Sequence, residues 1–412
     1  MTPSSAPVRA VPVRDLSSPP TPPPAGAFLS GVLALQIANN ALHLAQPLLI
    51  AELSGSLAIA AAVSAGDTAL HMLGTFLTGP AADRLGSRRV LILTTLGRAA
   101  ALAVIPLAAA LGRLTLPVAL AAYALDAIVR GGIDTAAHAL PQELALDAAG
   151  LDRLNARYEL AFDLGAVVGP LLLGLSLVAR SSAAHAVIPL GFAGAALLFW
   201  LIPQAKADRA APVKAARVDP WEAVRLLRAD RKLAWGCAAL AALNLYPLRK
   251  LVSAFFAKAI LHQKAAAGWI GAAFGLGGVA GSLLYARYGR RLPPKVWLGL
   301  GAAGSVLLGV GVLPGSLAAV AAAAFFFSLL NVGARLSLTT SVQAATPRAA
   351  AGRVAALWRS ASNLVSVALK AAAGAVFAAK AGAGPAFAVL AAGLAALALL
   401  QAALGARFVK KG

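Results

Sequence analysis

The sequence predicts an all-α membrane protein in which twelve transmembrane helices form two pseudo-symmetric bundles of six. Three observations carry this prediction: a very apolar composition, apolar runs of spanning length along the whole chain, and a polar segment near its middle. Of the 412 residues, 60% are hydrophobic and 12% are charged, whereas a soluble protein carries about 25% charged residues. About 20 apolar residues cross a bilayer as a helix. The twelve runs are 27–50, 57–78, 90–111, 115–139, 158–179, 185–203, 233–260, 267–286, 296–314, 317–343, 354–379 and 385–405.

These runs divide the chain into five parts. Residues 1–25 carry eight prolines together with Ser and Thr, a composition typical of a disordered, extended tail. The first bundle covers 26–203 and the second covers 233–406. A cytoplasmic linker at 204–232, rich in Lys, Arg and Asp, joins them, and residues 407–412 form a cytoplasmic tail.

The basic residues predict the orientation of the chain. The net charge is +21, but the cations lie in short clusters between apolar runs, so a nucleic-acid partner is not expected. With the N-terminus inside, cytoplasmic segments hold 24 of the 36 Lys and Arg and outer loops hold four. This bias predicts a multi-pass protein with both termini cytoplasmic, most simply in a bacterial inner membrane. The single cysteine excludes an internal disulfide.

The two halves of the chain repeat weakly. Arg84-Leu-Gly recurs as Arg287-Tyr-Gly, and Asn40 of the first run corresponds to Asn244 of the seventh. Pro141, after the fourth run, corresponds to Pro347, after the tenth. The three offsets are similar, which indicates a duplicated six-helix unit.

A charged segment separates the second and third runs. It reads Gly-Pro-Ala-Ala-Asp-Arg-Leu-Gly-Ser-Arg-Arg, and its defining positions are Gly79, Asp83, Arg84, Gly86, Arg88 and Arg89. Glycines permit a tight turn, and the charges are costly in hydrocarbon. The pattern resembles the loop between helices two and three of major facilitator superfamily transporters.

That resemblance implies an alternating-access transporter, monomeric as is usual in the family, whose rocking is controlled by this loop. It implies that Asp83 caps the helix starting near Val354. It also implies that Arg84 pairs with Asp134 or Glu143, near Glu159 and Asp163. A purely structural cap predicts the same residues, so the charges alone do not distinguish a switch from a brace.

The resemblance also implies that helices 1, 4, 7 and 10 line a central cavity. Their polar residues are Asn39, Asn40, His43, Asp126, Arg130, Asp134, Asn244, Tyr246, Arg249, Lys250, Asn331 and Arg335. Asp126, Arg130 and Asp134 are spaced i, i+4, i+8 and form one polar stripe, which is either a structural ladder or a contact for substrate or proton. In the third run, which the resemblance places against lipid, Arg98 is expected to snorkel to the interface.

The second bundle contains no acidic residue, because all fifteen lie between Asp15 and Asp230. Cations in its spans therefore need partners from the first bundle or from an anionic substrate. Asp67 and His71 are expected to meet Arg359 or Lys370 across the bundle interface, with snorkelling of Lys370 as the alternative. Asp67 with His71, or Asp134 with His138, also has a spacing that permits metal ligation together with His43.

The fifth run contains Gly165, Gly169, Pro170 and Gly174, which bend a helix and permit close approach of another. This segment resembles the glycine-proline motif of drug:proton antiporters, and with the residues upstream it resembles macrolide and siderophore exporters of the superfamily.

The sequence therefore predicts a secondary transporter, not an enzyme, that exports a small organic molecule. Its partners are that substrate and membrane lipids. No cofactor is expected, and the proton is the predicted coupling ion, carried by Asp67 or Asp126 because burial favours the neutral carboxyl group. The alternatives are an organic-anion importer or facilitator using Arg249 or Arg335, a lipid translocator, and a divalent metal transporter.

Overall fold

A computed structural model describes most of the chain. The described residues are 23–144, 148–179, 181–203, 225, 227–243, 246–289, 291–345, 351–379 and 383–410. All regular elements within these ranges are α-helices. They are α1 (Pro23–Ser54), α2 (Leu57–Leu85), α3 (Ser87–Ala110), α4 (Leu116–Leu144), α5 (Ala148–Ala179), α6 (Ser181–Trp200), α8 (Arg231–Leu243), α9 (Tyr246–Ala259), α10 (Ala266–Tyr288), α11 (Pro294–Gly311), α12 (Leu317–Ala345), α13 (Ala351–Ala378) and α14 (Ala383–Lys410).

Nine of the described helices contain a stretch long and apolar enough to cross a membrane. Shorter apolar helices at His185–Trp200 and Leu233–Ala242 fall within two more of the expected spans. The predicted all-helical membrane fold is therefore confirmed. The expected seventh span holds two described helices, α8 and α9, on either side of residues 244–245. Pro247 lies in the first turn of α9, where a proline is tolerated because its missing N–H has no helical partner there.

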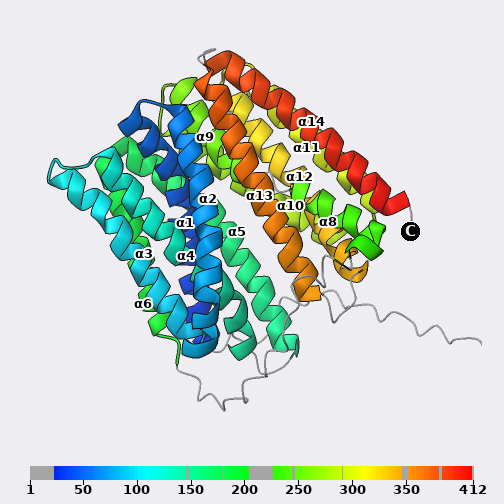
Figure 1. The fold of residues 1–412 in the computed structure, drawn as a ribbon, viewed down its shortest axis with the longest axis horizontal. Helices are drawn as coiled ribbons and strands as arrows, with labels where there is room; N and C mark the ends of the chain where they lie inside the picture. Colours follow the sequence, from blue (N-terminus) through cyan, green and yellow to red (C-terminus); the bar gives the residue numbers. More distant parts are fainter. Residues whose placement is uncertain are drawn as a thin grey trace, which may run out of the picture.

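Helices run alternately between two ends of the molecule. We call the end where α1 begins and α2 stops the terminal face, and the end at the α1–α2 connection, residues 55–56, the distal face. In Figure 1 the distal face is at the top, with α1–α6 on the left, α8 and α10–α14 on the right, and α9 near the top between them. Among the cytoplasmic clusters predicted from the sequence, Arg88 and Arg89 begin α3 and Arg231 begins α8, all at the terminal face.

The predicted charged loop at 79–89 is mostly helical, which corrects the expectation from the sequence. The α2 helix continues to Leu85 and α3 begins at Ser87, so Gly86 alone joins them. Its φ of 81° lies in the left-handed region, which glycine adopts without a Cβ clash. Hydropathy marks where a helix leaves the membrane and not where the helix stops, and this explains the difference.

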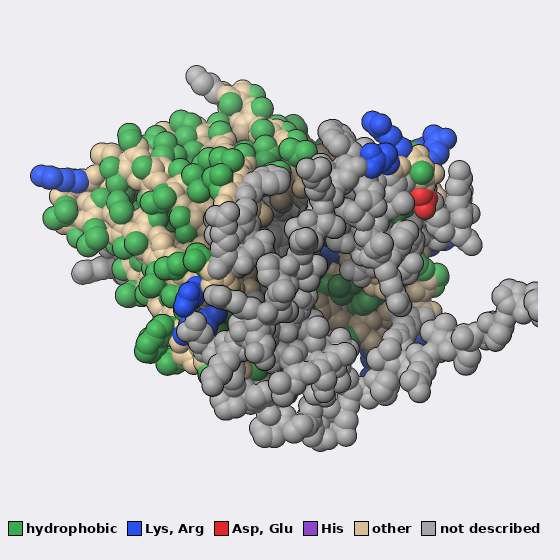
Figure 2. Space-filling view, turned by 60° about the horizontal axis from the view of Figure 1, so that its bottom comes forward, with side chains coloured by type: hydrophobic (Ala, Val, Ile, Leu, Met, Phe, Trp, Pro, Cys, Tyr) green, Lys and Arg blue, Asp and Glu red, His purple; other side chains and the backbone are tan. Residues whose placement is uncertain are grey.

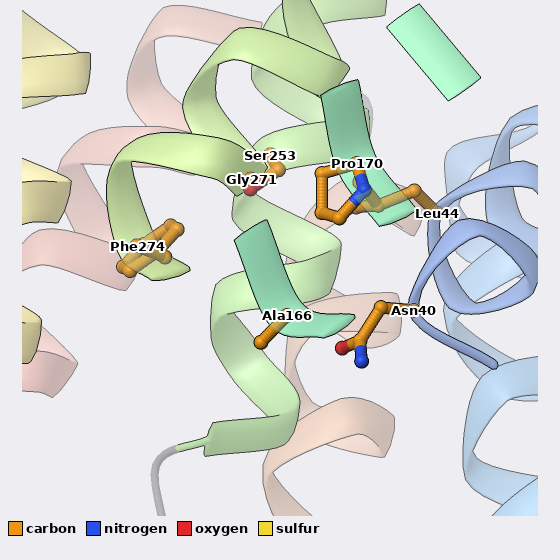
Figure 3. Close-up of a pocket in the computed structure, with 7 residues that line it drawn as sticks. All are labelled: Asn40, Leu44, Ala166, Pro170, Ser253, Gly271 and Phe274. Atoms are coloured by element: carbon orange, nitrogen blue, oxygen red, sulfur yellow. The ribbon is translucent and has the colours of Figure 1, made fainter. Parts of the chain in front are cut away.

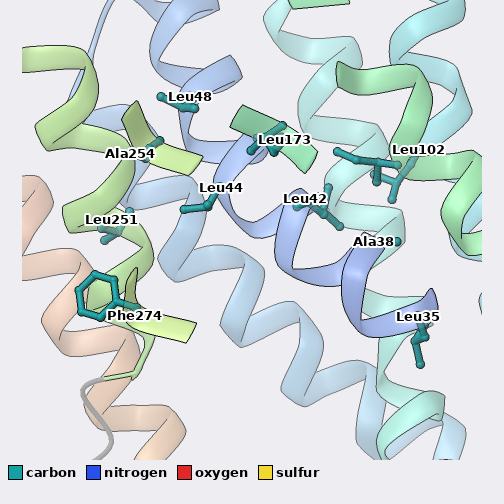
Figure 4. Packing of buried hydrophobic residues seen from close by; sticks show 14 of the residues in the cluster. Leu35, Ala38, Leu42, Leu44, Leu48, Leu102, Leu173, Leu251, Ala254 and Phe274 are labelled. Carbon is teal, nitrogen blue, oxygen red and sulfur yellow. The ribbon is translucent and has the colours of Figure 1, made fainter. Parts of the chain in front are cut away.

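The described helices pack into two groups, α1–α6 and α8–α14. In the first group α1 packs on α5 and α6, and α4 packs on α2 and α3; in the second, α12 packs on α10 and α11, and α8 on α13 and α14. Contacts between the groups join α2 to α13, α5 to α10 and α1 to α9. The buried apolar core is continuous across this boundary, running from Leu35 of α1 to Leu251 of α9 and Phe274 of α10 (Figure 4).

The described contacts between the groups are concentrated toward the distal face. A Cβ added to Gly268 would lie 2.5 Å from the Pro170 carbonyl oxygen, and one added to Gly275 would lie 2.5 Å from the Ala166 carbonyl oxygen. One turn closer to the terminal face, a Cβ on Gly278 would meet nothing within 4 Å. Figure 2, in which the terminal face is turned forward, shows a recess on that side. The structure is therefore closed toward the distal face.

Candidate transport site and charge network

Arg98 on α3 is a fully buried charged residue of the first bundle. It lies eleven residues beyond Ser87, so at 1.5 Å per residue it sits about 16 Å along the helix, near the middle of a hydrocarbon core about 30 Å thick. Its side chain is 1% exposed. The expectation that Arg98 snorkels is therefore wrong, because the side chain is too far from either interface to reach it.

Arg98 instead binds groups on three other helices. Its Nε and Nη2 donate to the two carboxylate oxygens of Asp126 on α4, at 2.7 Å and 3.3 Å. Nη2 also donates to Oδ1 of Asn39 on α1 at 3.2 Å. The guanidinium lies 4.0 Å from the ring centroid of Phe192 on α6, a geometry suited to a cation–π contact. Arg98 therefore ties α1, α3, α4 and α6 together.

A second arginine continues this network toward α2. Arg130, one turn after Asp126 on α4, donates from Nη2 to Oδ2 of Asp67 at 2.8 Å. Its Nε donates to Nδ1 of His71 at 3.3 Å, and its Nη1 is 3.9 Å from Asp126 Oδ2. Asp67 and His71 therefore share Arg130 as their partner within the first bundle, although the sequence predicted partners across the bundle interface.

One cation of the second bundle reaches this network. The ammonium group of Lys370 on α13 donates to the Ser64 carbonyl oxygen at 3.0 Å and to Thr68 Oγ1 at 2.6 Å, both on α2. Lys370 is 9% exposed. Lys370 therefore crosses the bundle interface to uncharged groups of α2, and its ammonium group is buried there rather than at the membrane surface.

The network carries an imbalance of charge. Its cations are Arg98, Arg130 and Lys370, and its carboxylates are Asp67 and Asp126. With His71 neutral, the buried sum is one positive charge. Isolated charge is costly in a low-dielectric interior, so the imbalance is tolerable only while hydrogen bonds such as those to Ser64 and Thr68 solvate the lysine.

A cavity lies where the two bundles meet, apart from these charges. It is small, about 20 Å³ when the space open to solvent is left out, and is lined by Asn40, Leu44, Ala166, Pro170, Ser253, Gly271 and Phe274, drawn from α1, α5, α9 and α10 (Figure 3). Its described lining is apolar apart from one amide and one hydroxyl, and Nδ2 of the amide, on Asn40, donates to the Gln36 carbonyl at 2.8 Å. Such a surface suits an uncharged organic group.

The glycine-proline segment of α5 serves two different contacts. Cβ atoms added to Gly165 and Gly169 would lie 2.4 Å from Gln36 Cβ and 2.5 Å from the Ile37 carbonyl oxygen, on α1. Pro170 lines the cavity, and a Cβ on Gly174 would lie 3.2 Å from the Ala265 carbonyl oxygen beside α10. One face of α5 is therefore held within its own bundle, and the other meets the second bundle.

The charged segment at the α2–α3 junction is described in part. Arg88 Nη2 donates to the Trp200 carbonyl oxygen at 2.6 Å, placing a cation at the C-terminal end of α6, where the helix dipole favours it. Arg89 is exposed. The side chains of Asp83 and Arg84, and the space around Gly79, lie outside the described part, so their roles at the gate stay predictions.

The remaining predicted residues lie in several places. Asn331 is buried on α12, Arg335 is exposed on the same helix, and His43 and Asp163 are half-buried on α1 and α5. Asn244 falls outside the described residues. The side chains that are not described belong to Tyr246, Arg249, Lys250, Asp134, His138, Glu143, Glu159 and Arg359.

The described part of the structure offers no support for metal ligation by Asp67, His71 and His43, and the side chains of Asp134 and His138 lie outside that part. Among the described residues, no group of three or more His, Cys, Asp or Glu is placed to hold a metal ion. His71 Nδ1 faces the Nε of Arg130 instead, a cation that would repel a metal.

The family of the chain follows from a comparison with known proteins. The model of the Major Facilitator Superfamily matches residues 27–248, which is more than half of the chain. The chain belongs to this superfamily. The protein is therefore a membrane transporter, as its glycine- and arginine-containing α2–α3 junction predicted.

A curated relative of this transporter is the multidrug efflux pump Tap of Mycolicibacterium fortuitum, 31% identical over 153 residues. That match spans 36% of this chain and 37% of the relative, so the chain matches less than half of the relative's length.

Solved structures share the fold across nearly the whole chain. A bacterial homologue of the iron transporter ferroportin, in an inward-facing state, has a TM-score of 0.71 and 16% identity, covering 93% of this chain and 98% of that one. A peptide transporter, POT, has a TM-score of 0.71 and 16% identity, with 97% of each chain covered. The nucleoside transporter NupG has a TM-score of 0.68 and 12% identity, covering 93% and 99%. At these identities the likeness shows the fold alone.

Several residues of the site were not found from the sequence. Ser64 and Thr68, which bind Lys370, and Ser253 and Phe274, which line the cavity, have ordinary side chains whose importance depends on helix rotation. For Arg98 a signal existed, since its depth in the third span exceeds the reach of a snorkelling side chain.

Proposed function

We propose that this transporter exports a small, uncharged or weakly polar organic molecule by alternating access, in exchange for protons that move inward. The observation that carries the proposal is the separation of two sites. The cavity between the bundles has an uncharged described lining, whereas the paired charges lie within the first bundle. Substrate and proton would then bind at different places, and the movement of the bundles would couple the two.

The charge network supplies the group for the proton in this proposal. Asp126 accepts hydrogen bonds from Nε and Nη2 of Arg98, and its side chain is fully buried. Asp67 accepts a hydrogen bond from Arg130 Nη2 and lies beside the interface with α13. Asp67 is therefore the carboxylate that bundle movement can affect, and we assign the proton to it.

The cavity supports an apolar or uncharged substrate over an organic anion. The described lining contains no Lys or Arg, and Arg335 does not belong to it. The partial match to a multidrug efflux pump is in keeping with export. In this proposal the terminal face, with its basic clusters, is cytoplasmic, and the membrane is a bacterial inner membrane.

The test is substrate-driven proton movement in proteoliposomes loaded with the pH dye pyranine. Adding the macrolide erythromycin, a weakly basic amine, outside drives the drug inward and protons outward, so the lumen becomes more alkaline than in protein-free liposomes, where only passive entry of the amine contributes. We expect this signal in the wild type and its loss in Asp67→Asn, while Glu52→Gln, a half-exposed carboxylate at the distal face, behaves as wild type.

Two further probes separate the alternatives. Ethidium tests a cationic drug and benzoate tests an organic anion. Proton movement driven by benzoate but by neither of the other two probes would replace the proposal with anion transport. A flux equal to that of protein-free liposomes with all three probes would contradict it.

A further inference from the structure

Lys370 holds a position that the proposed exchange does not by itself explain. It belongs to the second bundle, yet its ammonium group is buried against α2 of the first, where it binds Ser64 and Thr68. Thr68 is the residue next to Asp67 in the chain. The lysine therefore brings a third cation to a network that already has one arginine for each carboxylate.

We propose that Lys370 and the transported proton occupy the neighbourhood of Asp67 in turn. When the distal face is closed, the ammonium lies beside an ionised Asp67; when the distal face opens, the ammonium withdraws with α13 and the carboxylate binds a proton. This inference rests on the proposed function, since it names the residues that would link proton binding to the rocking of the bundles.

The charges support an exchange of one cation for the other. In the structure, Arg98, Arg130 and Lys370 face two ionised carboxylates, which leaves one positive charge. If Asp67 bound a proton while Lys370 stayed, two buried positive charges would remain uncompensated, which is costly. If Lys370 left as the proton arrived, the two arginines and the ionised Asp126 would again sum to one positive charge. The buried charge is then the same in both states.

The position of Lys370 along α13 supports its withdrawal. One turn toward the distal face, a Cβ added to Gly374 would lie 3.3 Å from both the Ala58 carbonyl oxygen and Ala61 Cβ on α2. Ser64 and Thr68 follow on the same helix. The α2–α13 contact thus continues from the distal end down to the lysine, so any opening of the distal face separates Lys370 from α2.

The other charged groups near Asp67 stay with the first bundle. Arg130 of α4 and His71 of α2 act on Asp67 electrostatically, as does Lys370. Asp67 and Arg130 act on Lys370, and the described side chains of α8, α9 and α14, which also pack on α13, contribute no further charge there. Since α2 and α4 belong to one bundle, Lys370 is the partner that rocking removes.

The proton path follows from the geometry. With the distal face open, a proton from water on that side binds an Asp67 carboxylate oxygen. Closure returns the Lys370 ammonium to Ser64 and Thr68, and the nearby positive charge favours the ionised carboxylate. The proton then leaves to water on the side of the terminal face, and no other co-reactant is needed.

The test measures the distance between the bundles at the distal face as a function of pH, with no substrate present. Spin labels are attached through Arg113→Cys and Leu313→Cys, both in exposed connections on that face, in a Cys237→Ser background. Electron–electron double resonance is recorded from about pH 8 to about pH 5, a range that covers shifted carboxylates. The wild type should populate a longer distance at low pH.

Variants distinguish this inference from the proposed function. Lys370→Met should abolish the pH-dependent change, because protonation no longer competes with an ammonium. Lys264→Gln, which removes another cation that joins the bundles at the distal face, should keep it. Asp67→Asn should populate the longer distance at every pH. Elution of each variant as one monodisperse peak shows that it is folded.

Three results would overturn the inference. An unchanged pH response in Lys370→Met, with erythromycin-driven proton movement intact in the wild type, would remove the role of Lys370 and leave the proposed function standing. Loss of the pH response in His71→Gln, with its retention in Asp67→Asn, would show that the proton binds the His71 imidazole and not Asp67. A wild type without any pH response would remove the link between protonation and bundle movement.

Discussion

The two bundles differ in the charged residues that they bury. The first bundle buries Asp67, Asp126, Arg98 and Arg130, and matches each carboxylate with an arginine. The second bundle has no acidic residue at all, and its described buried polar side chains are uncharged except for Lys370, which is held by the other bundle. Among the described residues, the paired buried charges are therefore concentrated in the first bundle.

This difference suggests a division of labour. Paired charges hold the helices of the first bundle together and offer a carboxylate that can change its protonation. The second bundle moves as an apolar body that brings one cation to the first. The predictions below test this comparison, beginning with the largest expected effect.

The largest effect is expected inside the first bundle. Asp126→Asn leaves the Arg98 guanidinium buried without its carboxylate, and breaking a buried ion pair costs roughly 3–5 kcal/mol. The midpoint of thermal unfolding in detergent should fall strongly. The double variant Arg98→Met, Asp126→Leu should recover most of the loss, because it removes both charges together. A single variant as stable as wild type would show that this pair does not hold the bundle.

A smaller effect is expected where the two bundles share Lys370. Thr68→Val keeps the shape of the side chain but removes the hydroxyl that accepts from the ammonium at 2.6 Å. A hydrogen bond to a charged group contributes roughly 1.5–3 kcal/mol, so the distal-closed state should lose about that much. The measurement is the population of the longer label distance at neutral pH.

Thr94→Val on α3 is the matched control, since the Thr94 hydroxyl donates only within its own helix, to Val90 and Leu91. Equal distance distributions in the two valine variants would show that the Thr68 contact does not stabilise closure.

The contact of α5 with α10 should respond to added volume. Gly275→Val adds a side chain at a position where even a Cβ would lie 2.5 Å from the Ala166 carbonyl oxygen. Overpacking of this kind costs roughly 1–3 kcal/mol. The distal face should open, which would be seen as faster labelling of a cysteine placed in the α5–α10 contact. At Gly278 an added Cβ would meet nothing within 4 Å, so Gly278→Val should leave the labelling rate unchanged. Similar labelling rates in both variants would contradict the observed contact.

The smallest effect is expected at the surface. Lys264 Nζ lies 2.7 Å from Glu52 Oε2, but the two side chains are 37% and 48% exposed. Exposed pairs contribute only roughly 0.2–1 kcal/mol, so Lys264→Gln should shift the label distances slightly, and less still at high salt. A shift as large as that of Thr68→Val would reverse the ranking of buried and exposed bridges.

Much of this architecture could be predicted from the sequence, because the bilayer imposes it. Apolar runs gave the helices, and the Gly79–Arg89 segment identified the superfamily that the comparison confirms. Lys370 was expected to cross the bundle interface because the second bundle lacks acids.

The predictions that the structure corrects depend on the rotation of each helix about its axis and on its depth in the membrane. Asp126 faces Arg98 and Arg130 points to α2, whereas spacing alone shows only that they share a stripe. Hydropathy also missed the extension of α2 to Leu85, since a helix continues beyond the membrane wherever its residues permit.

The most direct test of the central claim is the ratio of protons to drug in proteoliposomes containing Lys370→Met. Radiolabelled erythromycin and pyranine are followed in the same vesicles. If the ammonium links proton binding to bundle movement, the variant should still move the drug while the coupled alkalinisation falls to the level of protein-free liposomes. Drug and proton fluxes in the wild-type ratio would contradict the account.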